Sequence, residues 1–280
     1  MIRHAQVAGT FYPRDEEALI KEIESSFICL LGPGELPKNE KKEVITPFFV
    51  VPHAGYMYSG PIASWSYLEL SKFQQPQTVI ILGPNHHGIG PDIAVPEKVE
   101  TWKTPFGSVE IDHRLIDKIL DIYPSVKRND LAHQREHSIE VQLPFLQYIY
   151  NEPFKLIPIG LKNQNYDICL MLGEILAKVC EKEDIVIIAS SDLTHYESHD
   201  KAKEKDLQVL QAVEEMDTKK LYEIRSDLNV SMCGHGPIGV TIESAKRMGR
   251  SSGKILKYAT SGDSSGIKNQ VVGYGSVAFY

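Results

Sequence analysis

The chain has 280 residues, of which 42% are hydrophobic and 24% are charged, a mixture typical of a folded globular protein. Its net charge of −7 disfavours a surface that binds nucleic acid or anionic membranes. No apolar run approaches the roughly 20 residues that span a bilayer, and the N-terminus lacks the layout of a signal peptide. The four cysteines form neither a CxxC pair nor a disulfide scaffold, so we expect a protein of the reducing cytoplasm.

The apolar pattern predicts helices and strands that alternate along the chain. The first helix is expected from Asp15, before a loop at 32–37, with one apolar face made of Leu19, Ile20, Ile23 and Phe27. Buried strands are predicted at 44–51, 78–82, 154–159 and 184–189, and shorter or terminal ones at 92–95, 99–103, 107–111, 254–261 and 271–279. Further helices are predicted at 60–72, from Asp112 to 122, and at 166–182, 198–215, 218–225 and 237–248. Continuous apolar strands between helices indicate one α/β domain, with a central sheet flanked by helices.

Three of the predicted strands end in loops that carry histidine. His53 follows the first strand, His86 and His87 follow the second, and Asp192 and His195 follow the third. In open α/β sheets, ligands bind beyond the carboxyl ends of the strands, so we expect these loops to converge on one site. A single histidine is more often a half-buried structural residue, and the prediction therefore rests on the three loops together.

A glycine-flanked turn at 232–237, just before the last predicted helix, adds a thiol and another imidazole. A cysteine near the start of a helix lies at the positive end of its dipole, which favours the thiolate. A lone cysteine is more often a small buried hydrophobe, and Cys29, Cys169 and Cys180 are expected to be core residues. Thiolate, imidazole and carboxylate together suit zinc, iron or copper, and suit magnesium or calcium poorly.

The carboxylates near the histidines have two interpretations each. Asp192 either orients His195, which then acts as an acid or base near neutral pH, or caps a loop. His137 and Glu140 are three residues apart and share a face if they lie on a helix. They then either surround the site or belong to a capping box or an exposed polar face.

Motifs spread in order along nearly the whole chain resemble those of the Memo family. They are Ala8-Gly9-Thr10-Phe11-Tyr12-Pro13, Pro52-His53-Ala54-Gly55-Tyr56, Gly83-Pro84-Asn85-His86-His87, Glu136-His137-Ser138-Ile139-Glu140, Ser190-Ser191-Asp192-Leu193-Thr194-His195 and Cys233-Gly234-His235-Gly236-Pro237-Ile238-Gly239. The resemblance implies a fold similar to that of the class III extradiol dioxygenases, non-haem iron enzymes that open catechol rings with two histidines and a glutamate on iron.

The resemblance also implies which residues hold a metal. His53 and His87 correspond to the two histidine ligands, and Cys233 stands where the dioxygenases have glutamate. His195 resembles their acid/base histidine, with Asp192 beside it. A soft thiolate in place of glutamate favours copper or a different iron chemistry over ring cleavage. We expect further side chains to surround these ligands or to contact the substrate: His86, His137, Glu140, His235 and Tyr56.

The resemblance implies a cytoplasmic protein that binds iron or copper and is redox-active or oxygenase-like, with a small molecule or peptide in its cleft. Members of the family bind phosphorylated receptor peptides in animals, and the microbial members imply radical-SAM system proteins as partners. One alternative is a non-catalytic module that binds a peptide or partner in the same cleft, which Tyr56, Tyr58, Trp102 and Tyr196 would line. Another is a metal-free thiol hydrolase that uses Cys233 with His195 or His235.

Overall fold

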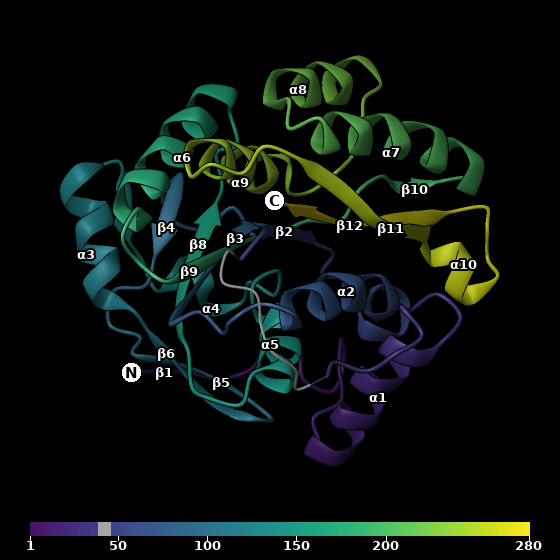
Figure 1. Cartoon of the computed structure of the whole chain (residues 1–280), viewed down its shortest axis with the longest axis horizontal. Helices are drawn as coiled ribbons and strands as arrows, with labels where there is room; N and C mark the ends of the chain where they lie inside the picture. Colours follow the sequence, from purple (N-terminus) through teal and green to yellow (C-terminus); the bar gives the residue numbers. More distant parts are fainter. Residues whose placement is uncertain (39–45) are drawn as a thin grey trace.

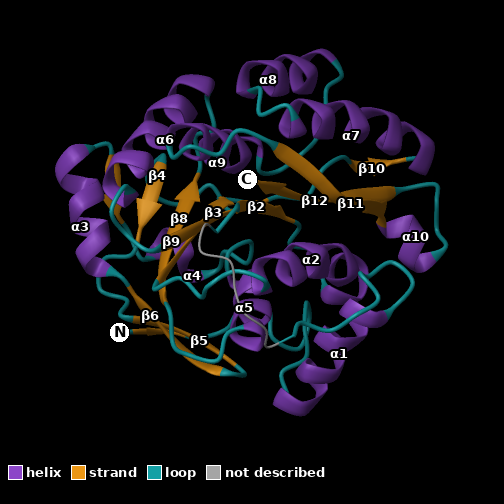
Figure 2. Cartoon of the chain, viewed as in Figure 1, coloured by secondary structure: helices purple, strands orange, loops and turns teal. Residues whose placement is uncertain are grey.

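A computed structural model describes residues 1–38 and 46–280 and confirms the α/β architecture, with the described strands joined in one sheet between helices (Figures 1 and 2). The strands are β1 (Ile2–Arg3), β2 (Phe48–Val51), β3 (Thr78–Pro84), β4 (Ile93–Val95), β5 (Thr101–Thr104), β6 (Gly107–Ile111), β7 (Val126–Arg128), β8 (Lys155–Leu161), β9 (Ile185–Ser190), β10 (His195–Glu197), β11 (Gly253–Thr260) and β12 (Val271–Phe279). The helices are α1 (Glu16–Ile28), α2 (Tyr56–Ser71), α3 (His113–Ile122), α4 (Leu131–Gln134), the 3-10 helix η1 (Glu140–Gln142), α5 (Leu143–Ile149), α6 (Tyr166–Cys180), α7 (His199–Glu214), α8 (Thr218–Asp227), α9 (His235–Arg247) and α10 (Ser261–Ser265).

Four parallel strands form the centre of the sheet, in the order β8, β3, β9 and β2, and β12 continues the sheet antiparallel to β2. Every residue of β3 and β9 is buried, as expected for strands covered on both faces. Helix α9 packs on β9 and β2, and α2 packs on β2 and β12 from the other side of the sheet (Figure 1). Because the four strands are parallel, the loops that follow them leave from the same edge.

Most predicted elements are confirmed within a few residues, and the differences have local causes. Helix α2 begins at Tyr56, four residues before its predicted start, so Pro61 lies inside it and not in its first turn, where proline is better tolerated. Strand β2 begins at Phe48, and the first two residues of its predicted range lie outside the described residues. Cys29 caps the end of α1 and is half-buried, so the expectation that it belongs to the core is wrong. The short elements β1, β7, β10, α4, α5 and α10 had no predicted counterpart.

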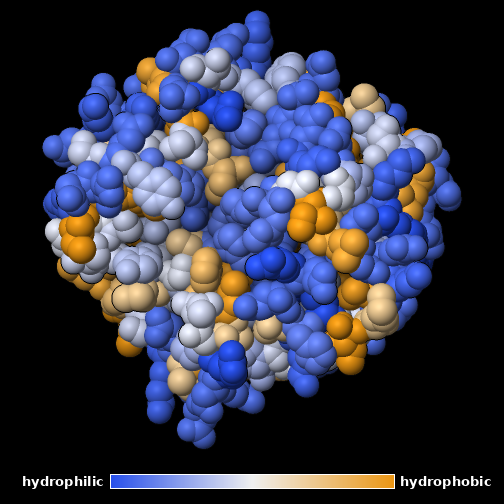
Figure 3. Space-filling model, turned by 180° about the vertical axis from the view of Figure 1, so that it is seen from behind, coloured by the Kyte–Doolittle hydropathy of each residue, from blue (hydrophilic) through white to orange (hydrophobic). Residues whose placement is uncertain are grey.

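The surface seen from behind in Figure 3 is mainly hydrophilic, with apolar side chains in small groups. Among the described residues, no helix is both long and apolar enough to cross a membrane. The large aromatic side chains are instead mostly inside, and those buried almost completely include Trp102, Tyr67, Phe27 and Phe145. Burial of such side chains is the main favourable contribution to the stability of this fold.

A buried carboxylate joins helix α7 to the C-terminal strands. One oxygen of Asp206 accepts a hydrogen bond from the Thr194 backbone N–H at 3.0 Å, and the other accepts one from the Tyr258 hydroxyl at 3.0 Å. Gly273 makes this approach possible, because a Cβ atom there would overlap the second oxygen. Burial raises the pKa of Asp206 to about 6, although these hydrogen bonds oppose the shift.

We expect Asp206→Asn to remove a pH-dependent part of the stability. The raised pKa means that the protonated carboxyl favours the folded state, so its contribution is complete below about pH 4 and is lost as the pH rises through about 6. The shift from 3.8 corresponds to roughly 3 kcal/mol. The free energy of unfolding, measured in urea between pH 4 and 7, should fall by most of this amount relative to the variant. Its amide does not titrate, and it can accept from Thr194 N–H through oxygen and donate to the Tyr258 oxygen through nitrogen.

Asp200→Asn, at an exposed position on the same helix, is the matched control and should follow the wild-type pH profile. Parallel profiles for the wild type and Asp206→Asn would show that burial does not raise the pKa of this carboxyl.

Candidate metal centre

Three histidine rings converge at the carboxyl edge of the central strands. His53 lies two residues after β2, His86 lies two residues after β3, and His137 lies between α4 and η1. One ring nitrogen from each lies within 4.8 Å of the corresponding atoms of the other two. The rings of His86 and His137 are stacked, with centroids 4.7 Å apart, and His53 meets both edge-on at 5.3 and 5.5 Å. We call these three residues the histidine cluster.

The carboxylate of Glu136 holds two members of the cluster in place. It accepts hydrogen bonds from the His86 and His137 backbone N–H groups at 2.7 and 2.9 Å, and from Ser138 N–H at 2.9 Å. Its Oε1 atom also lies 2.9 Å from Nδ1 of His86. Burial alone would raise the pKa of Glu136, but the His86 hydrogen bond and its charge, with the backbone donors, hold that pKa well below its usual range. The ionised carboxylate can only accept, so His86 carries its proton on Nδ1 and presents Nε2 to the cluster.

His53 is the buried member of the cluster, with 2% of its surface exposed. Its Nδ1 atom lies 2.9 Å from the Ser190 hydroxyl, and its Nε2 atom lies 3.4 Å from Sγ of Cys233. Burial, and then the neighbouring imidazoles of His137 and His86, lower the pKa of His53 well below its ordinary value. Burial likewise lowers the pKa of His137 to about 4. Both rings are therefore neutral at neutral pH, the form that binds a metal.

Cys233 borders the cluster from the turn before α9. Part of the residue is exposed, but Asp192 N–H donates to its sulfur at 3.2 Å and His53 lies on another side. Desolvation of the sulfur, and then the Asp192 carboxylate, raise the pKa of the Cys233 thiol. The prediction that the helix start favours a thiolate is therefore wrong for the metal-free protein, because enclosure outweighs the helix dipole. A neutral thiol also weighs against a metal-free thiol hydrolase, which needs the thiolate as its nucleophile.

His87 lies outside the histidine cluster. Its Nε2 atom is 3.1 Å from the Arg135 carbonyl oxygen, and the residue is exposed. Neighbouring side chains in this loop point in different directions, and the contacts with Glu136 turn His86, not His87, toward His53. The geometry thus corrects the expected grouping of His53 and His87, since His86 takes the inward position. Because His86 is also exposed, solvent can reach the cluster from this side.

Asp192 and His195 follow β9, but their contacts differ from those expected. Asp192 accepts a hydrogen bond from the His53 backbone N–H at 2.8 Å, and burial raises the pKa of Asp192 to about 6. The His195 backbone N–H donates to Ser231 at 2.8 Å, and among the described residues Nδ1 of His195 finds no hydrogen-bond partner. Asp192 therefore anchors the His53 loop, and it does not orient His195 through Nδ1.

Glu140 makes its hydrogen bonds to the N-terminal segment and not to the histidine cluster, which differs from its expected place at the site. His137 precedes η1 and does not share a helix with Glu140, so their spacing does not put them on one face. Glu140 instead forms a buried ion pair with Arg3 at 2.7 Å and accepts a hydrogen bond from the Tyr12 hydroxyl at 2.8 Å. It also accepts the backbone N–H of Val7 at 3.0 Å. This carboxylate fastens the N-terminal segment to the domain.

The remaining expected residues have structural contacts. Tyr56 is buried, and its hydroxyl donates to the Val141 carbonyl at 2.7 Å. His235 packs against the Tyr222 ring with centroids 5.4 Å apart, and burial lowers the pKa of His235 to about 4. Trp102, expected along the cleft, is buried beneath the guanidinium of Arg3.

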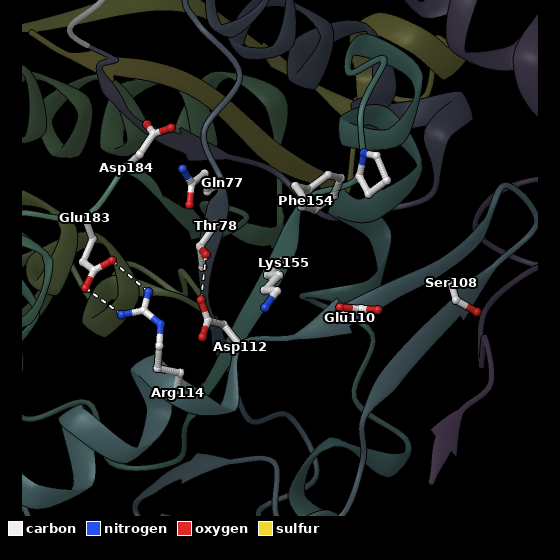
Figure 4. A pocket seen from close by; sticks show the side chains of 11 residues that line it. Gln77, Thr78, Ser108, Glu110, Asp112, Arg114, Phe154, Lys155, Glu183 and Asp184 are labelled. Atoms are coloured by element: carbon white, nitrogen blue, oxygen red, sulfur yellow. Dashed lines mark hydrogen bonds and ion pairs between the residues drawn. The ribbon is translucent and has the colours of Figure 1, made fainter.

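A pocket of about 420 Å³ lies near the cluster, and its lining includes Phe11, Gly55, Met57 and Tyr58. The Phe11 ring stands between the two, with its centroid 4.9 Å from that of His137. A second pocket, of about 520 Å³, opens at the amino ends of the same strands (Figure 4). Its lining holds charged side chains such as the Arg114–Glu183 pair, but no histidine or cysteine.

Three residues of the centre were missed by reasoning from the sequence. Glu136 was visible as the acidic neighbour of His137, and a carboxylate beside a histidine is a signal for a positioning contact. Ser190, the last residue of β9, contacts Nδ1 of His53, and Gln142, the last residue of η1, donates to the Ser190 hydroxyl at 2.7 Å. Neither position carries a local pattern that points to His53.

Sequence comparison identifies the family, because a family model described as Memo-like protein matches residues 3–278. The chain belongs to the Memo family. It is similar to MEMO1 family proteins of Methanopyrus kandleri, at 46% identity over 281 residues, and of Ignicoccus hospitalis, at 44% identity over 283 residues. Both alignments cover 100% of this chain and 99% of the relative. An uncharacterized protein of Escherichia coli K12 has a similar fold, with a TM-score of 0.54 and 13% identity over 84% of this chain and 100% of that one.

In this Memo-family chain, we expect Glu140→Gln to destabilise the fold without involving the histidines. The amide keeps hydrogen-bonding atoms but loses the charge that compensates the buried Arg3. Leaving one member of a buried ion pair uncompensated costs roughly 3–5 kcal/mol. Urea unfolding at neutral pH measures this loss.

Glu183→Gln is the control, since it removes the same charge from a surface ion pair with Arg114. It should change the free energy of unfolding by about 1 kcal/mol or less. If the two substitutions lowered the free energy of unfolding equally, the buried Arg3–Glu140 ion pair would not be the stabilising contact proposed for the N-terminal segment.

Proposed function

We propose that this Memo-family protein binds iron or copper at the histidine cluster and acts as a redox or oxygenase-like protein. The observation that carries the proposal is the convergence of three imidazoles, with ring nitrogens within 4.8 Å of one another. Two of the three rings are anchored through their other nitrogen, by Ser190 and Glu136. Anchoring of the outer nitrogen is the usual arrangement of metal-binding histidines.

The donors fit a borderline or soft transition metal. Imidazole nitrogens suit iron, copper and zinc, whereas magnesium and calcium prefer oxygen ligands. Cys233 Sγ, 3.4 Å from Nε2 of His53, offers a fourth donor if it loses its proton. Zinc fits the same donors, so the test below separates a redox metal from a structural or hydrolytic one.

A bound iron or copper ion would supply a redox centre with a position open to a further ligand. The chain supplies the surroundings. The pocket lined by Phe11, Met57 and Tyr58 lies on the other side of the Phe11 ring from His137 and offers apolar and aromatic contacts to a small molecule near the cluster. His195, whose Nδ1 has no hydrogen-bond partner within residues 1–38 and 46–280, is the proposed group that gives a proton to this ligand or takes one from it.

A binding module without turnover remains the second proposal, favoured by one observation. Tyr196, next to His195, is 74% exposed and has a φ of 60°, an uncommon conformation for a tyrosine. An exposed aromatic side chain held in this way suits contact with a peptide or small ligand. Binding that survives the loss of the metal would support this proposal.

We expect His53→Ala, His86→Ala and His137→Ala each to abolish stoichiometric metal binding. Each removes one of three converging donors, and the effect should exceed the 10–100-fold loss typical of an outer contact. The measurement is the iron, copper and zinc content of protein purified without oxygen, by mass spectrometry, with Cys233→Ser alongside.

His87→Ala is the matched control, because it removes a neighbouring imidazole that lies outside the cluster. It should retain wild-type metal content. Loss of metal in His87→Ala with retention in His86→Ala would overturn the assignment, and zinc alone in every preparation would overturn the redox function.

Glu136→Gln should weaken metal binding by about 10–100-fold. The amide is neutral, so it holds the proton on Nδ1 of His86 less strongly and reduces the basicity of Nε2. Titration with Co²⁺, followed by its visible absorption, gives the affinity. An unchanged affinity in a folded variant would show that this carboxylate has only a structural role.

A further inference from the structure

His53 can present a lone pair to the cluster only in one tautomer. A neutral imidazole carries its single proton on either Nδ1 or Nε2. Only the Nδ1–H form leaves Nε2, the nitrogen beside Cys233, free to accept a proton or a metal. For His86 a carboxylate fixes the tautomer, whereas the partner of His53 is the Ser190 hydroxyl, which can both donate and accept.

The contacts of Ser190 determine where its one proton goes. The hydroxyl lies 2.6 Å from the Ser138 carbonyl oxygen, which can only accept, so the Ser190 proton is used there. The Gln142 amide nitrogen donates to the hydroxyl oxygen at 2.7 Å. The remaining lone pair of that oxygen faces Nδ1 of His53 at 2.9 Å and accepts a proton from it.

The orientation of the Gln142 amide is itself fixed by its neighbours. Its nitrogen lies 3.0 Å from the Pro52 carbonyl oxygen, and its oxygen accepts the Tyr67 hydroxyl at 2.5 Å. Turning the amide over would set two acceptors, the amide oxygen and the Pro52 carbonyl, against each other. The amide nitrogen therefore has to face Ser190. Tyr67, Gln142 and Ser190 are all buried, which keeps water from replacing these contacts.

We propose that the chain Tyr67–Gln142–Ser190 acts as a tautomer lock, in which Ser190 and Gln142 are positioning residues that keep the proton of His53 on Nδ1. Nε2 is thereby presented to the cluster before any metal arrives. Sγ of Cys233 lies 3.4 Å from Nε2, on the side of the ring to which this tautomer presents its lone pair. The inference rests on the proposed function only in its consequence for metal affinity, since the tautomer is a property of the metal-free protein.

The lock differs from the Glu136 contact in carrying no charge. A second carboxylate behind the buried His53 would require its own compensation and would raise the pKa of the imidazole. The Ser190 hydroxyl is neutral, and its contacts with Ser138 and Gln142 leave one lone pair facing Nδ1 of His53. It therefore selects the same tautomer as a carboxylate would, without adding a charge.

The test is nitrogen NMR of the histidine side chains in metal-free, 15N-labelled protein, with the His53 signals assigned by their loss in His53→Gln. The wild type should show His53 as the Nδ1–H tautomer. Ser190→Ala removes the acceptor, so the signals should shift to Nε2–H or to a mixture of the two forms. Zn²⁺ affinity, measured as a redox-silent probe, should fall by about 10–100-fold.

Ser66→Ala is the matched control. Ser66 is buried in the same way, but its hydroxyl contacts Ser276 and the Val50 carbonyl, not a histidine. This variant should keep both the tautomer and the affinity. Gln142→Met is the second test variant, and it carries the test if Ser190→Ala does not fold. It removes one of the two contacts that hold the hydroxyl in a single orientation, so the hydroxyl can turn from the Ser138 carbonyl toward Nδ1 in part of the molecules, and the same shift should appear in smaller measure.

An Nε2–H tautomer in the wild type, or a tautomer unchanged in both test variants, would overturn the lock. The outcomes separate it from the proposed function. A tautomer that shifts in a protein that binds no metal supports the lock and contradicts the metal centre. Wild-type metal binding with an unchanged tautomer in the variants does the reverse.

Discussion

The carboxylate of Glu136 is the contact on which the site depends. It is buried, yet it stays ionised because backbone N–H groups and the His86 ring surround it with donors. Those donors belong to two loops that are 50 residues apart in sequence, so satisfying one charge also fixes the relative position of His86 and His137. A buried carboxylate without these donors would be too costly to keep. The geometry of the histidine cluster follows from that requirement.

Burial has opposite consequences for the different groups of the centre. It keeps the imidazoles of His53 and His137 neutral and ready to donate a lone pair, and it keeps the Cys233 thiol protonated. In the metal-free protein, the neutral rings of His53 and His137 can therefore bind a metal directly, whereas the Cys233 thiol must first lose its proton. A metal ion supplies the charge that stabilises a thiolate, so the fourth donor is formed by binding and is not present beforehand.

The N-terminal segment completes the surroundings of the cluster although it lies far from it in sequence. The Arg3–Glu140 ion pair and the Tyr12 hydroxyl fix this segment against the domain. Phe11 is thereby placed on the ring of His137, at the wall of the neighbouring pocket. Glu136 and Glu140, four residues apart, therefore have different roles. Glu136 fixes the positions of His86 and His137, and Glu140 fixes the N-terminal segment that places Phe11 against His137.

The sequence by itself determined the fold class, the main strands and helices, the Memo family and the edge of the sheet where the histidines gather. Continuous apolar strands followed by polar loops carry that information locally. Only the tertiary structure decided that His86 and not His87 faces His53, that Glu140 binds Arg3, and that Ser190 and Gln142 stand behind His53. Those choices depend on side-chain directions in irregular loops and on hydrogen bonds between residues up to 137 positions apart, which no local pattern encodes.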